Sequence, residues 1–232
     1  MVRLTAFVLE PDMAKRCIST DEAPRLVRDA GILSLVSDGM RLSGDFSKLL
    51  PRVRGGRLGS ELLVRAARLK GGPGHPTAVD GTAGLGEDSF LLAAAGFDVT
   101  LFERDAAIAA LLADALERAA ADPGLAAIAS RMHLVEADAV NAMAELDFTP
   151  DLVYLDPMFP AKRGSAQAKK KLQMLQMLER PCEDEDELLE AVFAAAPAKI
   201  VVKRPVKGPY LAGRKPSHSV SGKLVRYDCY LL

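Results

Sequence analysis

Several classes of protein are disfavoured by what this chain lacks. The three cysteines, Cys17, Cys182 and Cys229, are widely spaced and odd in number, so we expect neither a disulfide framework nor a cysteine-rich metal site. The three histidines are not spaced as metal ligands, and no metal is expected. No apolar run is long enough to span a membrane, and the amino terminus lacks a basic-then-apolar signal pattern. We therefore expect a cytoplasmic protein with no membrane partner.

The charge balance gives no general reason to expect a nucleic-acid partner. Lys and Arg number 30 and Asp and Glu number 31, which leaves a formal net charge of −1. Any argument for a nucleic acid must therefore rest on local basic patches. Hydrophobic residues make up 49 % of the 232 positions, enough for the core of one large α/β domain and a small appendage.

A regular alternation of strand and helix patterns begins after a Gly/Pro-rich break in the chain. Five strands are predicted, at Thr77–Asp80, Asp98–Glu103, Met132–Ala137, Asp151–Leu155 and Lys199–Lys203. Helices are predicted between them, at Glu87–Ala95, Ala106–Ala120, Val140–Leu146 and Glu183–Ala196. Such crossovers indicate a mostly parallel sheet with helices on both faces. Two further strands, Ser217–Val220 and Lys223–Leu231, predict a C-terminal antiparallel hairpin and seven strands in all.

The first 76 residues are less regular. Strands are predicted at Leu4–Leu9 and Met40–Phe46 and a short helix at Glu22–Asp29, which indicates a small α+β extension over residues 1–55. An amphipathic helix at Ser60–Leu69 and the break at Gly71–Pro76 make residues 56–76 a connecting helix and linker. The main α/β domain then covers residues 77–232.

A glycine-containing loop follows the first predicted strand of the main domain. Gly84 and Gly86 let the backbone turn sharply and approach a ligand, and the helix that follows offers unpaired N–H groups. Glu103 ends the next strand, where a carboxylate can accept hydrogen bonds from both hydroxyls of a ribose. The plain structural alternative is a tight strand-to-helix turn that binds nothing.

Two features of this loop distinguish among ligands that contain a ribose. A nicotinamide site would need a third glycine where Ser89 stands. Asp80 and Glu87 put negative charge beside the loop, which opposes a pyrophosphate and favours a cationic ligand. S-adenosylmethionine combines a ribose, a positive centre and an amino group, and it fits these features.

The stretch from Asp151 to Pro160 says most about the chemistry. An apolar strand delivers Asp156, and Pro157 then ends the strand and stiffens the turn before Phe159. A carboxylate, a free carbonyl and an aromatic ring are thereby predicted at the carboxyl edge of the sheet, where open α/β sheets bind ligands. The ring can stack on a flat substrate while the two oxygens accept the hydrogens of its amino group, so these three residues are the catalytic candidates.

These motifs, in this order, resemble those of class I S-adenosylmethionine-dependent methyltransferases, which implies a Rossmann-like fold. The turn resembles the Asn/Asp-Pro-Pro-aromatic motif of enzymes that methylate exocyclic amines, although Met158 replaces the second proline. Roughly from residue 50 onward the chain resembles the J-type small-subunit ribosomal RNA methyltransferases, which methylate a guanine of 16S rRNA at N2. The segments that carry this resemblance are Asp80–Asp88, Leu101–Arg104, Val153–Pro160 and Val201–Pro205.

The resemblance implies where the cofactor binds. By position it places contacts at Glu87, Asp88, Glu103, Arg104, Asp138, Ala139 and Asp156. Glu103 is expected to hold the ribose, and Asp138 to accept from the adenine amino group with the backbone of Ala139 beside it. The loop itself adds Asp80, Gly84 and Gly86 as cofactor-binding candidates.

The implied partner is 16S rRNA or the small ribosomal subunit. Basic residues follow both the acidic turn and the last parallel strand, and the candidates for RNA contact are Lys162, Arg163, Lys203, Arg204 and Lys207. Loops at the carboxyl ends of parallel strands gather on one face, so these residues are predicted at the rim of the site. The alternative is that these charges only keep the surface soluble.

Other functions stay open on the residues alone. The same fold could methylate another RNA or DNA amine or a protein side chain, or it could serve as a non-catalytic RNA-binding module. A nicotinamide oxidoreductase is a more distant alternative. Carbon methylation would need a nucleophilic cysteine near the acceptor, and Cys182 opens an acidic segment far along the chain from Asp156.

Overall fold

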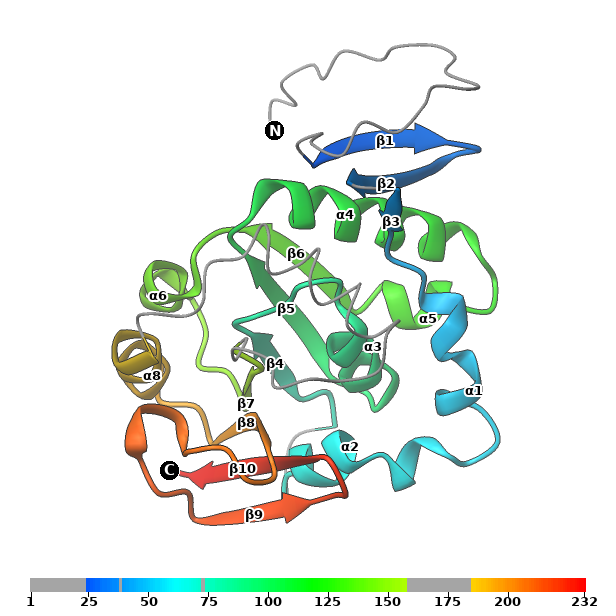
Figure 1. The fold of residues 1–232 in the computed structure, drawn as a ribbon. Coiled ribbons are helices and arrows are strands. Elements are labelled where there is room, and N and C mark those ends of the chain that lie inside the picture. Colours follow the sequence, from blue (N-terminus) through cyan, green and yellow to red (C-terminus); the bar gives the residue numbers. More distant parts are fainter. Residues whose placement is uncertain (1–23, 38, 72–73, 158–184) are drawn as a thin grey trace.

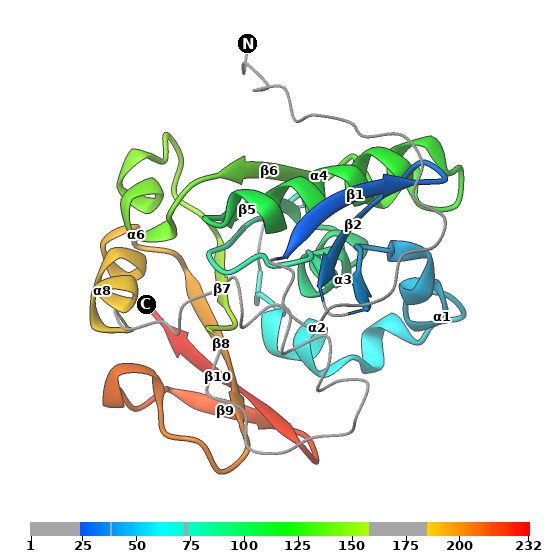
Figure 2. The same cartoon turned by 45° about the horizontal axis from the view of Figure 1, so that its top comes forward.

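The computed structural model describes residues 24–37, 39–71, 74–157 and 185–232. These residues form two sheets and the helices around them (Figure 1). The smaller sheet is antiparallel, in the order β1 (Arg25–Asp29), β2 (Ile32–Ser37) and β3 (Met40–Leu42). It lies across helix α4 (Ala106–Ala121), with β1 and β2 above that helix in Figure 1 and in front of it in Figure 2. Leu35 and Leu42 from the small sheet pack with Ile108 and Leu111 from the helix.

The larger sheet has seven strands in the order β6-β5-β4-β7-β8-β10-β9. Their bounds are β4 (Thr77–Asp80), β5 (Asp98–Glu103), β6 (Met132–Glu136), β7 (Leu152–Leu155), β8 (Lys199–Pro205), β9 (His218–Ser221) and β10 (Val225–Leu231). The first five are parallel, whereas β10 runs antiparallel to both β8 and β9. The predicted mostly parallel seven-stranded sheet with a C-terminal hairpin is confirmed.

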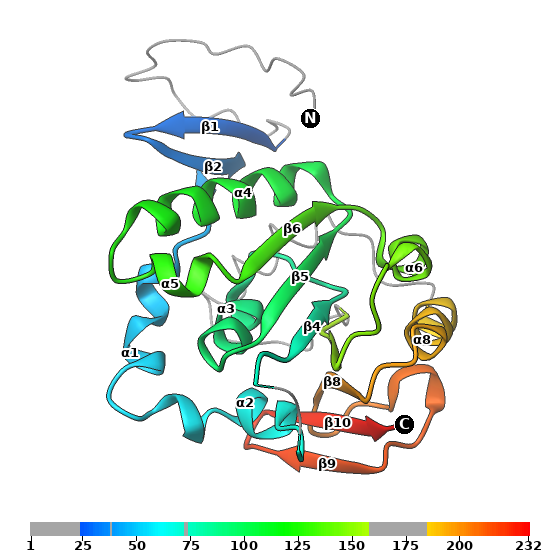
Figure 3. The ribbon, with the colours of Figure 1, turned by 180° about the vertical axis from the view of Figure 1, so that it is seen from behind.

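The strand order reverses between β4 and β7. From β4 the chain moves outward through β5 to β6, then returns to place β7 on the other side of β4. Figure 3 shows β6, β5 and β4 side by side from behind. In open α/β sheets such a reversal leaves a crevice at the carboxyl ends of the two central strands, and ligands bind there.

Both faces of the large sheet are covered by helices, as predicted. One face packs against α2 (Leu62–Ala67), α3 (Glu87–Ala94) and α4, with α1 (Leu50–Val53) and α5 (Ala126–Ala129) beyond them. The other face packs against α6 (Ala139–Ala142) and α8 (Glu185–Ala194), which lie side by side. Alternate residues of β7 supply the two cores, since Tyr154 belongs to the first and Leu155 to the second.

The helix predicted at Glu22–Asp29 is wrong over its described part, because Arg25–Asp29 forms strand β1. Ala30 and Gly31 both have positive φ, of 47° and 80°, and make the tight turn that pairs β1 with β2. The strand predicted from Met40 ends early at Leu42, where the chain turns into a short 3₁₀ helix, η1 (Phe46–Leu49), capped by the side chain of Asp45. Neither β2 nor α5 was predicted, and Leu4–Leu9 lies outside the described residues.

Short 3₁₀ turns complete the described chain, at η2 (Leu58–Ser60), η3 (Met143–Glu145) and η4 (Leu211–Gly213). None of the helices within the described ranges combines the length and the apolar character needed to cross a membrane.

Candidate active site

The glycine loop joins the end of β4 to the start of α3. Gly84 and Gly86 have φ values of 54° and 73°, in the left-handed region that favours glycine. A side chain at Gly86 would also place its Cβ 2.7 Å from Cδ1 of Leu112, beneath α3. Gly81 faces a similar limit, because a Cβ there would lie 2.8 Å from Cδ2 of Leu155. The positive φ values therefore favour glycine at positions 84 and 86, and a side chain at Gly81 or Gly86 would require Leu155 or Leu112 to shift.

Asp80 braces the loop from inside. Its side chain accepts a hydrogen bond of 3.0 Å from the backbone N–H of Thr82 and another from the hydroxyl of Ser89, which is itself buried. Burial raises the pKa of Asp80 to about 7, although the hydrogen bonds from Ser89 and Thr82 oppose the shift. Asp80 is 1 % exposed, so its negative charge lies under the loop. A direct contact between Asp80 and a cofactor stays a prediction.

Glu103 fixes the same loop from the end of β5. One carboxylate oxygen accepts from the backbone N–H of Gly84 at 2.8 Å, and the other accepts from that of Asp105 at 2.8 Å. Burial raises the pKa of Glu103, against the effect of these two hydrogen bonds. The carboxylate is therefore held in one orientation at the carboxyl edge of the sheet, where the sequence predicted it.

The acidic turn after β7 is bonded to the glycine loop. The backbone N–H of Asp156 donates to the hydroxyl of Thr82 at 2.6 Å, and the N–H of Gly81 donates to the carbonyl of Tyr154 at 3.0 Å. The side chain of Asp156 keeps 37 % of its surface exposed. Asp156 and Pro157 thus lie beside the loop, at the crevice between β4 and β7.

A chain of charged and polar groups crosses the crevice. The ammonium of Lys203 on β8 donates to Oδ2 of Asp156 and to Oδ2 of Asp88 on α3, both at 2.7 Å. The hydroxyl of Tyr154 donates to the same oxygen of Asp88 at 2.6 Å. Burial raises the pKa of Asp156, an effect that Lys203 opposes and Asp88 reinforces. Burial would lower the pKa of Lys203, but the two carboxylates outweigh it and raise this pKa.

The structure changes the expected role of two basic residues. Arg204 is wrong as an RNA contact, because its side chain is fully buried and donates to the carbonyl of Pro209 and to Glu185. Lys203 is not supported as a phosphate contact either, since its ammonium is bound by Asp156 and Asp88. Lys207 is exposed in the loop after β8, and its contact with RNA stays a prediction.

The predicted adenine contacts lie at the same edge of the sheet. Asp138 follows β6 and caps α6 by accepting from the N–H of Val140 at 2.9 Å. Arg104 follows β5, and its guanidinium lies 3.8 Å from Oδ2 of Asp138. Both side chains are partly exposed, while Ala139 is buried and Glu87 is exposed on the first turn of α3. Four strand ends therefore bring the cofactor candidates together.

Three participants in this site escaped the sequence-based reasoning, namely Thr82, Ser89 and Tyr154. Ser89 had a visible signal, since it stands where a nicotinamide site would have a third glycine, and its hydroxyl reaches the buried Asp80. Tyr154 looked like an ordinary strand residue. The candidates Phe159, Lys162, Arg163 and Cys182 lie outside the described residues.

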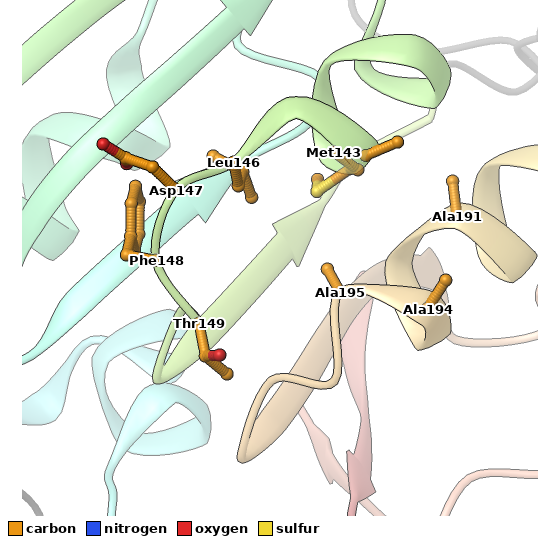
Figure 4. A pocket seen from close by; sticks show the side chains of 9 residues that line it. Met143, Leu146, Asp147, Phe148, Thr149, Ala191, Ala194 and Ala195 are labelled. Atoms are coloured by element: carbon orange, nitrogen blue, oxygen red, sulfur yellow. The ribbon is translucent and has the colours of Figure 1, made fainter.

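A separate pocket of about 370 Å³ lies between the segment that leads from η3 to β7 and the C-terminal end of α8 (Figure 4). It is lined by Met143, Ala144, Leu146, Asp147, Phe148, Thr149, Ala191, Ala194 and Ala195. These residues precede β7 and β8, so the pocket lies toward the strand beginnings and away from the site at the strand ends. Within the described ranges, no cluster of His, Cys, Asp or Glu could hold a metal ion.

Comparisons with known proteins match this geometry. The family described as putative SAM-dependent methyltransferase, where SAM is S-adenosylmethionine, matches residues 21–232. A ribosomal RNA small subunit methyltransferase J from Thioalkalivibrio sulfidiphilus is 48 % identical over 176 residues, covering 75 % of this chain and 69 % of that protein. This chain belongs to the ribosomal RNA small subunit methyltransferase J family.

Other members of the family support the assignment. The methyltransferase J of Aeromonas salmonicida is 44 % identical over 179 residues, covering 77 % of this chain and 71 % of its own. A crystal structure of a SAM-dependent methyltransferase from Neisseria gonorrhoeae is 34 % identical, with a TM-score of 0.74, and covers 92 % of this chain and 85 % of that one. The chain is therefore a Rossmann-like methyltransferase, and its cofactor is S-adenosylmethionine.

Proposed function

We propose that this methyltransferase transfers a methyl group to the exocyclic N2 amine of a guanine in 16S rRNA, in the cytoplasm. The observation that carries the proposal is the hydrogen bond from the backbone N–H of Asp156 to the hydroxyl of Thr82, which holds the turn that carries the Asp156 carboxylate against the cofactor loop. A relative that is 48 % identical to this chain over 176 aligned residues is named for small-subunit ribosomal RNA, which supports that substrate.

The residues at the strand ends fit S-adenosylmethionine. Glu103 is held by two backbone N–H groups, and each of its oxygens keeps a second lone pair for a ribose hydroxyl. We assign the adenine amino group to Asp138, with the backbone of Ala139 beside it. We assign the methionine part to the glycine loop and the first turn of α3, where the candidates are Asp80, Gly84, Gly86, Glu87 and Asp88. Arg104 is a further cofactor candidate at the end of β5, on the side of Asp138.

Asp156 and Pro157 prepare the acceptor. The lone pair of a guanine N2 amine is delocalised into the ring, which makes this nitrogen a poor nucleophile. Hydrogen bonds from its two hydrogens to the Asp156 carboxylate and the Pro157 carbonyl would pyramidalise the nitrogen and aim its lone pair. S-adenosylmethionine supplies an electrophilic methyl group on a sulfonium, which that lone pair attacks in line.

The protein contributes mainly orientation and fixed dipoles. The methylated nitrogen is a strongly acidic ammonium and sheds its proton without a strong base in the site. We also assign Phe159 to stacking on the guanine, a contact worth about 1–3 kcal/mol for an aromatic residue and a base.

The loop after β8 supports an RNA partner at the rim. Arg226 is nearly buried and donates to the carbonyls of Pro205, Val206 and Gly208 at 2.8–2.9 Å, which fixes the loop from below. On the outer side Lys207 is exposed, and Tyr210 is 38 % exposed with its ring 5.0 Å from the Arg226 guanidinium. We assign Lys207 to a phosphate, and Lys162 and Arg163, which lie outside the described residues, stay candidates for RNA contact.

The test is methylation of small ribosomal subunits taken from cells that lack this enzyme. Subunits are incubated with labelled S-adenosylmethionine and the protein, and the modified base is located by mass spectrometry. We expect one N2-methylguanine in 16S rRNA. A label on another base or on a ribosomal protein would overturn the assigned acceptor.

A matched pair of variants tests the role of the carboxylate. Asp156→Asn should lower methyl transfer about 1,000-fold or more, because an amide offers the amine one acceptor and a competing donor, a loss of about 4 kcal/mol. S-adenosylmethionine binding, measured by calorimetry, should change little. Asp147→Asn is the control, since Asp147 is exposed in the separate pocket. Full activity of Asp156→Asn would end this mechanism.

A further inference from the structure

Lys203 lies at the same level of the sheet as Asp156. β7 and β8 are parallel neighbours, and their last registered pair is Leu155 with Val202, so the next residues on each strand are Asp156 and Lys203. On its other side Lys203 pairs with Tyr227 of β10. The lysine is therefore held by a strand on each side, and only its ammonium reaches into the crevice.

The ammonium has two carboxylate partners from different elements. It lies 2.7 Å from Oδ2 of Asp156 after β7 and 2.7 Å from Oδ2 of Asp88 on α3. The Lys203 side chain is only 26 % exposed, so water screens these interactions less than at an open surface. Both contacts use one oxygen of each carboxylate, and Oδ1 of Asp156 is the oxygen that we assign to the acceptor amine.

Negative charge accumulates around this ammonium. Three carboxylates of the site, those of Asp80, Asp88 and Asp156, influence one another electrostatically. The groups of the described elements that face Lys203 and Asp156 are Asp80 on β4, Asp88 on α3, Tyr154 on β7, Arg204 on β8 and Tyr227 on β10, with Arg52 and Glu61 beyond them. Arg204 donates to the carbonyl of Pro209 and to Glu185, and among the described residues Lys203 is the cation bonded to Asp156.

We propose that Lys203 is a positioning residue for methyl transfer, which keeps Asp156 ionised and holds its Oδ2 so that Oδ1 faces the acceptor amine. The proposal rests on the role assigned to Asp156 above. A protonated Asp156 carries an O–H donor and is a weaker acceptor for the amine hydrogens than the carboxylate. Burial and Asp88 both favour that protonated form, and Lys203 opposes it.

The test is the pH dependence of methyl transfer by Lys203→Met, measured in single turnovers with saturating S-adenosylmethionine and small subunits. The acidic limb of the profile should move to higher pH by about one unit or more, since a charge partner at this distance shifts a carboxyl by that amount. Activity on the acidic limb should then fall by up to about ten-fold more than activity on the plateau near pH 9. A loss of equal size at every pH would indicate a merely structural role and overturn the proposal.

Two further variants sharpen the result. Asp88→Asn removes the competing carboxylate and leaves Lys203 to Asp156, so its acidic limb should move to lower pH. Lys223→Met is the control, because Lys223 is exposed in the turn between β9 and β10, and its profile should match that of the unchanged protein. Movement of the limb in the same direction for Lys203→Met and Asp88→Asn would contradict the charge argument.

A measurement that needs no turnover tests the proposal even if Lys203→Met is inactive. The Asp156 carboxyl is followed by ¹³C NMR over a pH titration, with its signal assigned by loss in Asp156→Asn. Its midpoint should rise by about one unit or more in Lys203→Met, and an unchanged midpoint would overturn the proposal. This titration needs no RNA, so failure to methylate the small subunit would reject the proposed function and leave the Lys203 result to be judged separately.

Discussion

The hydroxyl of Thr82 accepts a 2.6 Å hydrogen bond from the backbone N–H of Asp156. Thr82 belongs to the glycine loop, and its own N–H donates to the buried Asp80. A single residue thus connects the strand that begins the cofactor loop to the turn that receives the acceptor. Because methyl transfer needs the donor and acceptor to be aligned closely, a shift of either the cofactor loop or the acceptor turn should lower the rate.

Thr82→Val should therefore reduce the rate of methyl transfer more than it weakens cofactor binding. The substitution keeps the shape but removes the acceptor of the Asp156 N–H, and we expect kcat to fall about ten-fold, equivalent to about 1.4 kcal/mol. Calorimetry should show a change in S-adenosylmethionine affinity of about three-fold or less.

Thr77→Val provides the matched control for that variant. Thr77 makes the corresponding bonds at the opposite end of the same two strands, where its hydroxyl donates to Asp151 and accepts from the Asp151 N–H, both at 3.1 Å. We expect this variant to lower the melting temperature and leave kcat unchanged. Equal losses of kcat in the two variants would show that the bond at the site has no special role.

Glu103→Gln should weaken S-adenosylmethionine binding. A glutamine can accept from only one of the two N–H groups of Gly84 and Asp105, and its amide would face the other with a donor. We expect the dissociation constant to rise about 30-fold, a loss of about 2 kcal/mol. Glu136→Gln is the control, since Glu136 pairs with Glu103 in register at the end of β6 but is exposed. Similar dissociation constants for both variants would contradict the role given to Glu103.

Asp80 makes the stability of the fold depend on pH. Because burial raises its folded-state pKa to about 7, the folded protein keeps a proton that the unfolded chain loses near pH 4. The protonated carboxyl therefore makes its full contribution to the free energy of unfolding below about pH 4. This contribution is lost as pH rises to about 7, and the loss is on the order of 4 kcal/mol in all.

Asp80→Asn should remove that dependence. Chemical unfolding between pH 4 and pH 8 gives the free energy of unfolding of the variant and of the unchanged protein. The difference between them should shift in favour of the variant as pH rises, by about 1.4 kcal/mol per pH unit at most. Asp147→Asn, at an exposed position, should show a constant difference. Parallel curves for Asp80→Asn and the unchanged protein would mean that Asp80 is ionised throughout this range.

Arg226→Met should destabilise the protein and loosen the loop after β8. The guanidinium also pairs with Asp228, which is fully buried, so its loss leaves a buried charge short of partners. We expect unfolding to become easier by about 3–5 kcal/mol. Arg41→Met, which breaks an exposed pair with Asp29 at 3.2 Å, should cost about 1 kcal/mol or less. Denaturant unfolding of both variants decides between these values, and similar losses would contradict the buried role.

Much of the main domain could be predicted from the sequence because its strands are strongly apolar and its helices are either long or bounded by clear start and stop signals. The bounds predicted for Thr77–Asp80 and Asp98–Glu103 coincide with those of β4 and β5. The N-terminal part was harder, since Arg25–Asp29 is short, polar and mostly exposed. Its strand conformation comes from pairing with β2 across a two-residue turn, whereas local preference alone predicted a helix.

Local sequence patterns were enough to predict the parallel α/β plan, the glycine loop, and the positions of Glu103, Asp138 and Asp156 at strand ends. These follow from apolar periodicity and from where each run stops, both of which are local properties of the chain. The tertiary structure decided which groups meet: the bond from Asp156 to Thr82, the ammonium of Lys203 between two acids, and the burial of Arg204. Strand order and side-chain direction control those contacts, and both depend on packing between segments far apart in the chain.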